Sequence, residues 1–459
     1  MGETADALVV FGITGDLART KTLPALYDLT EQGVLTSPVI GVGRRPLRND
    51  EMHEHARAAI EAAKKDTLDR RILDTFLSRL SYIGGDAMDD ELYERLRTAL
   101  KGSKLPVFYL AIPPATFLES SENLAEAGLL DDARLVVEKP FGTDLVSARE
   151  LNRRLTALVP EHRLYRIDHF LGKEPVQDIM YLRFQNALFE PVWSREHVDS
   201  IQVTMAENFG VEGRGAFYDR VGALRDVVQN HLLQVLALVA MEPPAGDDDS
   251  VSRHRLDVFR SMPSADPAHA VRGQYQGYEK VEGVQPGSDT ETFVGLKLTI
   301  ENWRWAGVPI FVRAGKNMPV NATEIVVRLQ QVPELRYGAH RLESPGFDDV
   351  VFRIGRDAGM TITLFAKTPG ADDTREVTLD VSFLEELGKG PGPYERLLTD
   401  ALRGNTMLFP RWDVIEETWR IVQPLLDDPP PVEKYRRGTW GPRRVTTLAR
   451  RYGGWREPQ

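Results

Sequence analysis

The chain has 459 residues, with 57 lysine and arginine residues against 68 aspartate and glutamate residues, and its formal net charge is −11. Because 42% of the residues are hydrophobic, the composition is typical of a globular protein, and the length predicts two or three domains. The acidic balance excludes a general binder of nucleic-acid backbones, and the lack of cysteine excludes disulfides, thiolate nucleophiles and cysteine metal sites.

The N-terminal segment carries no recognisable targeting signal. Residues Met1 to Asp6 are acidic where a signal peptide would be basic. The longest apolar stretch, Leu232 to Met241, is interrupted by Gln234 and is much shorter than the roughly 20 residues that span a bilayer. Together with the lack of cysteine, these features predict a cytoplasmic protein that does not enter a membrane.

Short apolar runs alternate with longer helical patterns from the N-terminus to about Asp168. This alternation predicts a parallel α/β sheet, and because the runs are almost continuously apolar, helices should cover both of its faces. The predicted strands are Ala7 to Phe11, Val39 to Val42, Val107 to Ile112, Leu135 to Val137 and Leu164 to Ile167.

The first predicted strand runs into a glycine-containing turn, Gly12-Ile13-Thr14-Gly15-Asp16-Leu17-Ala18, and a helical pattern follows. Such a turn lets backbone amides approach a pyrophosphate at a helix N-terminus. The spacing GxxGxxA departs from the full dinucleotide fingerprint GxGxxG, so a strand-to-helix turn with purely structural glycines is the alternative. The position at the first βα turn favours the dinucleotide interpretation.

The second predicted strand ends in Gly43-Arg44-Arg45. Enzymes that use NAD typically place a carboxylate here for the ribose hydroxyls, whereas enzymes that use NADP place a cation here for the additional phosphate. No acidic residue occurs between Pro38 and Asn49, which favours NADP. The alternative is a pair of arginines that are merely solvated.

Three further strand ends in the same domain carry unusual residues: Pro113-Pro114, Glu138-Lys139-Pro140-Phe141-Gly142 and Asp168 to Glu174. Each of them alone is explained by a tight turn with surface charges. Because ligands of open α/β sheets bind beyond the carboxyl ends of the strands, several polar strand ends at one edge favour a binding crevice.

After Gly172 the pattern changes to alternating strands, which predicts an antiparallel sheet with a few helices. The strands are Ile201 to Met205, Thr292 to Ile300 and Glu324 to Leu329. A helix is predicted over Val221 to Met241, and His231 lies within its apolar stripe. A lone histidine there is usually a core residue bonded to a carbonyl, but Asp226 and Asn230 near the same face are unusual for a pure core.

Four segments together resemble the glucose-6-phosphate dehydrogenase family in order and spacing, and two more agree with it. The four are Gly12 to Ala18, Glu138 to Gly142, Arg166 to Glu174 and Gln229 to Gln234; the two are Asn208 to Gly215 and Asn302 to Pro309. The resemblance has clear motifs from about Gly12 to Lys316 and is more diffuse towards the C-terminus. The stretch around His169 is highly specific, whereas the glycine turn is not.

The resemblance implies a Rossmann-like NADP-binding α/β domain over residues 1–170. An α+β domain with a large, mainly antiparallel sheet should follow over residues 171–459, bind the substrate and take part in oligomerisation. The implied reaction is the oxidation of glucose 6-phosphate at C1 to 6-phosphogluconolactone in the oxidative pentose phosphate pathway, with hydride transfer to NADP. The expected partners are this sugar phosphate and copies of the chain in a homodimer or homotetramer, without nucleic acid or membrane.

The residues that match the family motifs agree with this chemistry. Loss of hydride from C1 requires loss of the O1 proton, and a neutral imidazole with a pKa of about 6.5 is a suitable base. His231 takes that role by its match to the family motif. Asp168 matches the carboxylate that bonds the far ring nitrogen of the base and stabilises the imidazolium. No step of this chemistry requires a metal ion.

The remaining site residues are assigned by their match to the family. The substrate phosphate is expected at His169 and Lys173, the sugar hydroxyls at Glu207 and Asp226, and further substrate contacts at Lys316 and at Lys139, between sugar and cofactor. The dinucleotide is expected against Gly12, Thr14, Gly15, Asp16, Leu17, Lys21, Arg44, Pro113 and Lys139.

Two departures from the family pattern affect the phosphate end of the site. Phe170 stands where the family usually has tyrosine, and Asn321 where it usually has a cation. They leave open a related NADP-dependent dehydrogenase of another hexose phosphate or of an unphosphorylated sugar. A non-catalytic homologue that binds NADP or a partner enzyme is a third interpretation, but the presence of His231 and Asp168 argues against it.

Overall fold

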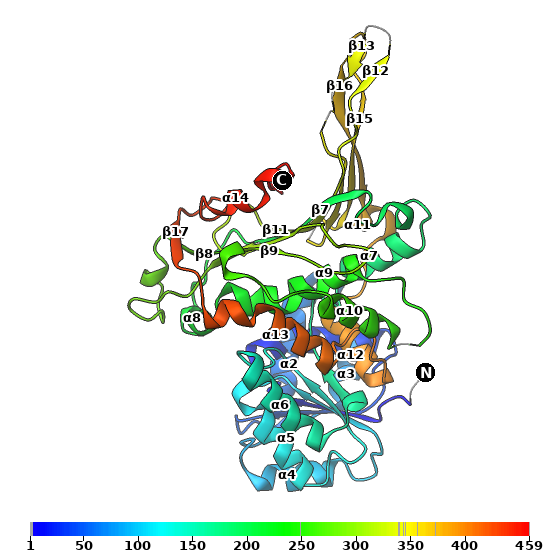
Figure 1. The fold of residues 1–459 in the computed structure, drawn as a ribbon. Coiled ribbons are helices and arrows are strands. Elements are labelled where there is room, and N and C mark those ends of the chain that lie inside the picture. Colours follow the sequence, from blue (N-terminus) through cyan, green and yellow to red (C-terminus); the bar gives the residue numbers. More distant parts are fainter. Residues whose placement is uncertain are drawn as a thin grey trace. The chain divides into compact units, whose positions relative to one another are not determined.

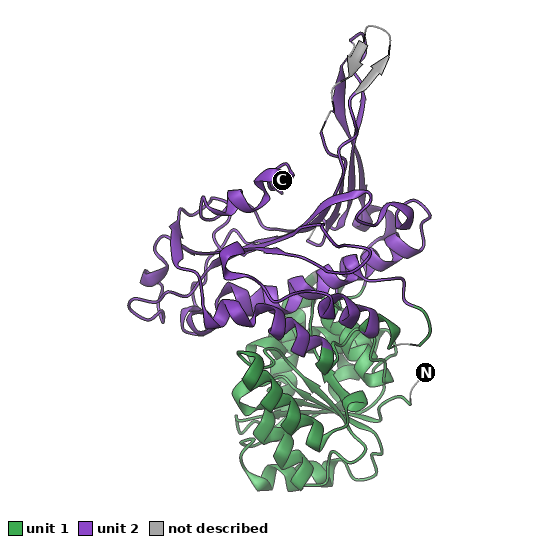
Figure 2. Ribbon diagram, in the orientation of Figure 1, with its two compact units in different colours: residues 1–172, 245–252, 391–413 green, residues 173–244, 253–390, 414–459 purple. Residues whose placement is uncertain are grey.

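The computed structural model describes residues 3–247, 249–337, 340–342, 344, 346–355, 357–371 and 373–458. The chain forms two compact units, and each is described by itself (Figure 2). The first unit comprises residues 1–172, 245–252 and 391–413, and the second comprises residues 173–244, 253–390 and 414–459. Each unit is thus assembled from segments that are far apart in the sequence, and the predicted domain division at residues 170 and 171 stays a prediction.

The first unit is built on a six-stranded parallel sheet in the order β3-β2-β1-β4-β5-β6, which confirms the predicted α/β arrangement. The strands are β1 (Ala7–Phe11), β2 (Val39–Gly43), β3 (Leu80–Gly84), β4 (Pro106–Leu110), β5 (Arg134–Val137) and β6 (Leu164–Arg166). The strand order reverses at β1, which pairs with β2 on one side and with β4 on the other. The sequence-based prediction lacks β3, an edge strand whose residues are only partly buried and so have no continuous apolar run.

Helices cover both faces of this sheet, as the continuously apolar strands predict. Along β1, Leu8 and Val10 belong to one core, whereas Val9 and Phe11 belong to the other. The first core is closed by α1 (Leu23–Glu31), α2 (Asn49–Lys64), α3 (Arg70–Arg79) and α12 (Pro393–Arg403); the second is closed by α4 (Asp90–Ala99), α5 (Phe117–Glu126) and α6 (Leu145–Leu158).

Helix α12 belongs to the first unit although it lies far along the chain. Its apolar side, formed by Leu397, Leu398, Ala401 and Leu402, is buried in the first core. The backbone carbonyls of Ala401 and Leu402 accept hydrogen bonds from Nη1 of Arg134 in β5 at 3.1 and 2.7 Å. The helix therefore completes the cover of the sheet and adds its own N-terminal residues to the unit that holds the predicted dinucleotide site.

The second unit contains a nine-stranded sheet in the order β16-β15-β14-β11-β7-β10-β9-β8-β17 (Figure 1). Six of its pairs are antiparallel, whereas β7–β10 and β8–β17 are parallel, so the predicted large, mainly antiparallel sheet is confirmed. The strands are β7 (Val198–Ala206), β8 (Ala270–Tyr275), β9 (Phe293–Leu298), β10 (Ile310–Gly315), β11 (Ala322–Leu329), β14 (Asp349–Arg353), β15 (Gly359–Lys367), β16 (Thr374–Ser382) and β17 (Val432–Tyr435), and a separate hairpin pairs β12 (Leu335–Tyr337) with β13 (His340–Leu342).

The remaining helices follow along the chain from α7 onward. They are α7 (Glu174–Phe184), α8 (Gly215–Ala223), α9 (Leu233–Ala240), α10 (Ser250–Arg260), α11 (Phe383–Leu387), α13 (Trp412–Asp427) and α14 (Val445–Ala449). None of the helices in the described part of the chain combines the length and the apolar character that crossing a membrane requires.

The predicted helix over Val221 to Met241 is interrupted near its start. Helix α8 contains Gly222, whose φ of 70° and ψ of 172° are not helical. A π-helix, η6 (Leu224–Leu232), begins after this break and continues into α9. In a π-helix the backbone hydrogen bonds join residues i and i+5 instead of i and i+4. Asp226, Asn230 and His231 all lie on this π-helical segment.

Candidate active site

The turn after β1 lies where the strand order reverses. Gly12 has a φ of +77°, and a Cβ atom on it would collide with the backbone carbonyl of Ala111, just after β4. The N–H group of Gly12 donates to the carbonyl of Val42 in β2 at 2.8 Å, and that of Gly15 donates to the carbonyl of Gly12 at 2.9 Å. The turn therefore requires glycine at position 12 and lies in the crevice where open α/β sheets bind ligands.

The other predicted cofactor residues of the first unit lie at or beyond the carboxyl ends of the same strands. Gly15 and Asp16 are exposed, and Lys21 is exposed on the short π-helix η1 (Ala18–Thr22) that leads into α1. Pro113 is exposed just after β4. The backbone at the start of a helix offers N–H groups and a positive dipole end, so this edge suits an anionic ligand.

Arg44 is exposed directly beyond β2, beside the turn. A Cβ atom on Gly43 would lie 3.0 Å from Oγ1 of Thr14, so the backbone next to Arg44 is close to that residue of the turn. The Tyr82 hydroxyl from β3 lies 2.9 Å from the Gly43 carbonyl and 2.7 Å from the Arg45 carbonyl, and so holds the arginine segment in place.

Two arginines, Arg45 and Arg19, bring positive charge to this segment. His55 on α2 has its pKa lowered, first by burial and then by the charges of Arg45 and Arg19. Arg19 comes from η1, four residues after Gly15, and its importance was not apparent from the sequence. Arg45, which follows β2, and Arg19, which also pairs with Asp16 at 3.2 Å, therefore both bring positive charge close to His55 at this edge.

Glu138 lies at the end of β5 and is 8% exposed. The Tyr109 hydroxyl from β4 donates a hydrogen bond of 2.7 Å to its Oε1, and the Tyr394 hydroxyl from α12 is a second donor to this carboxylate. Burial raises the pKa of Glu138 to about 7 in spite of these hydrogen bonds and of the neighbouring Lys139, which lower it. A carboxyl with a pKa of about 7 thus lies directly next to Lys139, a predicted site residue.

Asp168 and His169 follow β6, and Tyr394 lies beside both. Asp168 is 3% exposed, and its Oδ1 accepts a hydrogen bond of 2.9 Å from the N–H group of Phe170. The His169 ring is nearly parallel to the Tyr394 ring, with centroids 6.4 Å apart, and its edge meets the buried ring of Phe170 at 5.2 Å. Burial, Glu138 and Asp168 all raise the pKa of Tyr394. One tyrosine therefore links the ends of β5 and β6.

In the second unit, Glu207 and Lys316 form an ion pair at neighbouring strand ends. Glu207 follows β7 and Lys316 follows β10, two strands paired in parallel, and Nζ of Lys316 donates to Oε2 of Glu207. The rings of Phe209 and Tyr218 lie 5.3 and 5.4 Å from the same Nζ atom. A cation and a carboxylate that are held together in this way offer donors and acceptors for hydroxyl groups.

Asp226, Asn230 and His231 lie on η6. The Asn230 side chain supports the backbone of that helix, since its amide donates to the Asp226 carbonyl at 3.1 Å and its Oδ1 accepts from the His231 N–H group at 2.5 Å. Asp226 also acts on Tyr218, whose pKa lies well above its ordinary value because of burial, Asp226, Glu291 and, more weakly, Glu207. The carboxylates of Asp226 and Glu207 therefore share Tyr218 as a neighbour.

The residues of the predicted phosphate end lie at three places. Lys173 is half-buried and immediately precedes α7. Phe170 is 2% exposed, so its ring is buried. Asn321 is exposed and immediately precedes β11.

The sequence-based assignment missed the tyrosines that support the site. Tyr109 is one residue in an apolar strand, and nothing in its local pattern distinguishes its hydroxyl from others. Tyr394 lies much further along the sequence, at the start of α12. This helix belongs to the first unit although most of the preceding chain belongs to the second. The one available signal was Glu138, because a carboxylate directly after a fully buried strand needs donors from its surroundings.

Fold and site together define a class. A parallel sheet in the order 3-2-1-4-5-6 with a glycine turn at its switch point is the architecture of a dinucleotide-binding domain. Ionisable groups gather at the other strand ends of the same sheet. The second unit carries the Glu207–Lys316 ion pair at two strand ends of its own. The protein thus has a dinucleotide-binding α/β unit and a separate α+β unit.

Comparison with known proteins identifies the family. Residues 9–178 match the family model described as the glucose-6-phosphate dehydrogenase NAD binding domain, and residues 180–456 match that of the glucose-6-phosphate dehydrogenase C-terminal domain. The chain belongs to the glucose-6-phosphate dehydrogenase family.

Relatives resemble the chain along its whole length. It is 49% identical to glucose-6-phosphate 1-dehydrogenase 1 of Mycobacterium tuberculosis strain H37Rv, a match that covers 100% of this chain and 97% of the relative. The crystal structure of glucose-6-phosphate 1-dehydrogenase from Mycobacterium avium has a TM-score of 0.92 at 49% identity, with 100% of this chain and 99% of that chain covered. A glucose-6-phosphate dehydrogenase solved in complex with its substrate glucose 6-phosphate has a TM-score of 0.91 at 34% identity, with 100% of both chains covered.

Proposed function

We propose that this chain oxidises glucose 6-phosphate at C1 to 6-phosphogluconolactone with transfer of the hydride to NADP, a reaction of the oxidative pentose phosphate pathway. The observation that carries the proposal is the full-length likeness to an enzyme solved with glucose 6-phosphate bound. A steady-state assay of the purified chain with several sugars and both nicotinamide cofactors tests it. The highest kcat/KM is expected for glucose 6-phosphate with NADP, and a chain that reduces no cofactor in the presence of this sugar would refute the proposal.

In the proposed mechanism His231 removes the proton from the C1 hydroxyl group. Bound NADP would supply the hydride acceptor for C1, so the protein itself must move only the proton. We assign to Asp168 the orientation of the His231 imidazole, because a carboxylate bonded to the far ring nitrogen fixes the tautomer and stabilises the imidazolium. The burial of both side chains, at 3% exposure for Asp168 and 1% for His231, supports roles that need a fixed geometry.

The proposed sugar contacts divide by chemistry. Glu207 and Asp226 accept hydrogen bonds from the sugar hydroxyls, Lys316 donates, and Lys139 lies between sugar and cofactor. His169 and Lys173 hold the phosphate as cations or donors in an otherwise acidic chain. The Glu207–Lys316 ion pair and the contact between the His169 and Tyr394 rings support these assignments, because each orients a proposed contact residue.

NADP, rather than NAD, is the proposed cofactor. The turn suits a dinucleotide because glycine at position 12 allows the tight bend against the Ala111 backbone, at the crevice where open α/β sheets bind ligands. The residues proposed to line it are Gly12, Thr14, Gly15, Asp16, Leu17, Lys21, Arg44, Pro113 and Lys139. The backbone next to Arg44 lies close to Thr14. Burial and, after it, the charges of Arg45 and Arg19 lower the pKa of the nearby His55, so a further phosphate would meet positive charge here.

A second candidate function is oxidation of another hexose phosphate or of an unphosphorylated sugar. This candidate is favoured by the two residues that differ from the usual family pattern. The Phe170 ring is buried and has no hydroxyl, and Asn321 is exposed and has an amide instead of a cation. The same assay separates the candidates. Equal kcat/KM for glucose and glucose 6-phosphate would favour the unphosphorylated sugar.

We also propose that the chain forms a homodimer or homotetramer in the cytoplasm. Edge strand β16 and the following helix α11 expose apolar side chains, namely Leu379 (56%), Val381 (39%), Leu384 (53%) and Leu387 (75%). Such a group is typical of a protein interface. Sedimentation velocity should find no monomer at micromolar concentration, and Leu387→Glu should shift the distribution towards monomer. The lack of cysteine supports the location.

A further inference from the structure

The helix that carries Asp226, Asn230 and His231 starts at a break that only glycine permits. Gly222 has a φ of 70° and a ψ of 172°, a conformation that L-residues with a side chain rarely adopt. A Cβ atom on it would lie 2.5 Å from Oε1 of Glu291. The non-helical backbone at Gly222 therefore packs directly against the Glu291 carboxylate.

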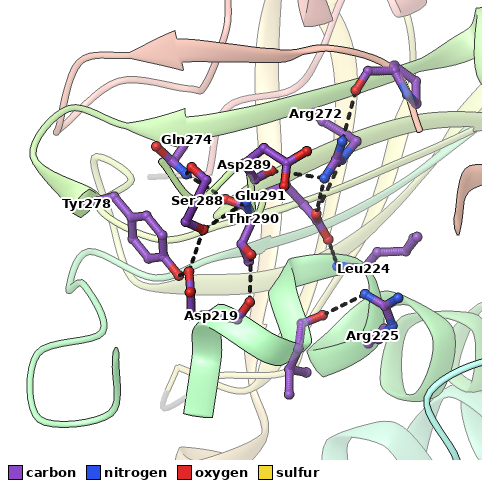
Figure 3. A network of polar contacts seen from close by, with 12 residues as sticks. Asp219, Leu224, Arg225, Arg272, Gln274, Tyr278, Ser288, Asp289, Thr290 and Glu291 are labelled. Atoms are coloured by element: carbon purple, nitrogen blue, oxygen red, sulfur yellow. Dashed lines mark hydrogen bonds and ion pairs between the residues drawn. The ribbon is translucent and has the colours of Figure 1, made fainter. Parts of the chain in front are cut away.

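Glu291 satisfies the first N–H groups after this break. The Ala223 N–H group donates to the backbone carbonyl of Glu291 at 3.0 Å. The Leu224 N–H group donates to Oε1 of Glu291 at 3.1 Å (Figure 3). The first N–H groups of a helix lack partners within the helix, and a negative charge at that end is stabilising. The N-terminus of η6 is therefore fixed to one buried carboxylate.

Arg272 on β8 holds the other oxygen of the same carboxylate. Its Nε and Nη2 atoms donate to Oε2 of Glu291 at 3.2 and 3.0 Å. The guanidinium also donates to the carbonyls of Pro430 and Asp289, both at 3.0 Å (Figure 3). The side chains of Arg272 and Glu291 are only 12% and 6% exposed, so the pair is a buried link from the helix start to the sheet.

We propose that the Glu291–Arg272 pair is a positioning device, which sets the register of η6 and thereby the directions of the Asp226 carboxylate and the His231 imidazole. Asp226 lies two residues and His231 seven residues after the capped Leu224. Because a π-helix is held by weaker, less common i to i+5 bonds, its start must be fixed from outside if the groups along it are to keep one direction. The inference rests on the proposed function, in which both groups touch the sugar.

Asp219 in the same network offers a matched control. Its carboxylate accepts hydrogen bonds from Tyr278 Oη at 2.9 Å and from Ser288 Oγ at 2.5 Å (Figure 3). It also accepts one from the Gln285 N–H group at 3.0 Å. These donors belong to the segment that leads into β9. Asp219 itself lies in α8, before the break at Gly222. Its loss should therefore weaken the same region without releasing the start of η6.

The test compares Glu291→Gln with Asp219→Asn. For each variant, the melting temperature, the affinity for NADPH by fluorescence titration, and kcat and KM for glucose 6-phosphate are measured. Because a misplacement of about 1 Å can cost about a hundredfold in rate, Glu291→Gln should lower kcat by about tenfold to a hundredfold at parental NADPH affinity. Asp219→Asn should change kcat by less than about twofold even where its melting temperature falls equally.

A second variant keeps the test decisive if Glu291→Gln does not fold. Arg272→Lys retains the positive charge but loses the planar fork that reaches the carboxylate and two carbonyls, and it should show the same fall in kcat in milder form. Parental kcat in the Glu291 or Arg272 variant, or an equal loss of kcat in the Asp219 variant, would overturn the positioning role. A parent chain without activity on glucose 6-phosphate would instead refute the proposed function, and that result precedes any variant.

Discussion

Glu138→Gln should make the stability of the protein less dependent on pH between about 4.5 and 7. The parent carboxyl is buried beneath the ends of β5 and β6, where burial raises its pKa from 4.5 to about 7. Between these two values the folded chain binds more protons than the unfolded chain, so the free energy of unfolding falls as the pH rises through this window. Glutamine does not titrate, so the variant lacks this contribution.

The size of the effect follows from the difference between the two pKa values. At about 1.4 kcal/mol for each pH unit, the parent should lose about 3 kcal/mol of stability at this site between pH 4.5 and pH 8, and the variant should not. Infrared difference spectra of parent minus variant report the protonated carboxyl directly, and urea unfolding at several pH values reports the change in stability.

Glu324 on β11 provides the matched comparison. Burial also raises its pKa to about 7, but it belongs to the second unit and is absent from the proposed site. Glu324→Gln should flatten the pH dependence in the same way while leaving KM for glucose 6-phosphate unchanged. Glu138→Gln should raise that KM, because Tyr394 loses a charged acceptor and its ring lies beside His169. A Glu138 carboxyl that ionises near 4.5 in the infrared titration would refute the reasoning from burial.

Three further substitutions test the assignments separately. Arg44→Ala should reduce the preference for NADP over NAD by roughly tenfold to a hundredfold, the worth of a charge-assisted contact of about 1.5 to 3 kcal/mol; equal effects on kcat/KM for both cofactors would remove Arg44 from the phosphate site. His231→Asn should lower kcat by at least about a hundredfold at unchanged NADPH affinity, and a variant with most of its turnover, when chemistry limits the rate, would make His231 a core residue. At fixed ionic strength, Asn321→Lys should lower KM for glucose 6-phosphate but not for glucose. If the ratio of kcat/KM for the two sugars does not change, position 321 lies away from the phosphate or another cation already binds it.

The strands of the first unit were predictable because each is buried on both faces. Val9 and Phe11 face one core and Leu8 and Val10 the other, so every residue of β1 after Ala7 had to be strongly apolar, and the run stands out in the sequence. Strand β3 lies at the edge of the sheet, where partly exposed residues such as Ser81 and Gly84 are tolerated. It therefore lacks a continuous apolar run and was not predicted. The position of the glycine turn followed from β1 alone.

The groups that support the proposed site were not predictable, because each acts across a long sequence distance. Nothing near Glu138 indicates that Tyr394 donates to it, since that contact exists only after α12 has packed on the sheet. An apolar stripe predicts a helix but does not distinguish i to i+4 from i to i+5 hydrogen bonds, so the π-helical form of η6 was hidden as well. Asn230, which was noted as unusual for a core, proves to bond the backbone of that helix.

The difference between the predictable motif residues and the unpredictable supporting residues has a physical origin. Most groups proposed to meet substrate or cofactor lie on short motifs at strand ends, where a side chain is both fixed and accessible. Asp226 and His231 lie instead on the π-helix η6. The groups that orient them must approach from outside that motif, since a residue next to the motif in sequence points to another face of its strand or helix. Glu291 meets this condition at the start of η6, and Tyr394 meets it at the ends of β5 and β6. Substitutions that impair kcat should therefore occur well outside the recognisable motifs, at residues that hold a helix start or a buried carboxylate in place.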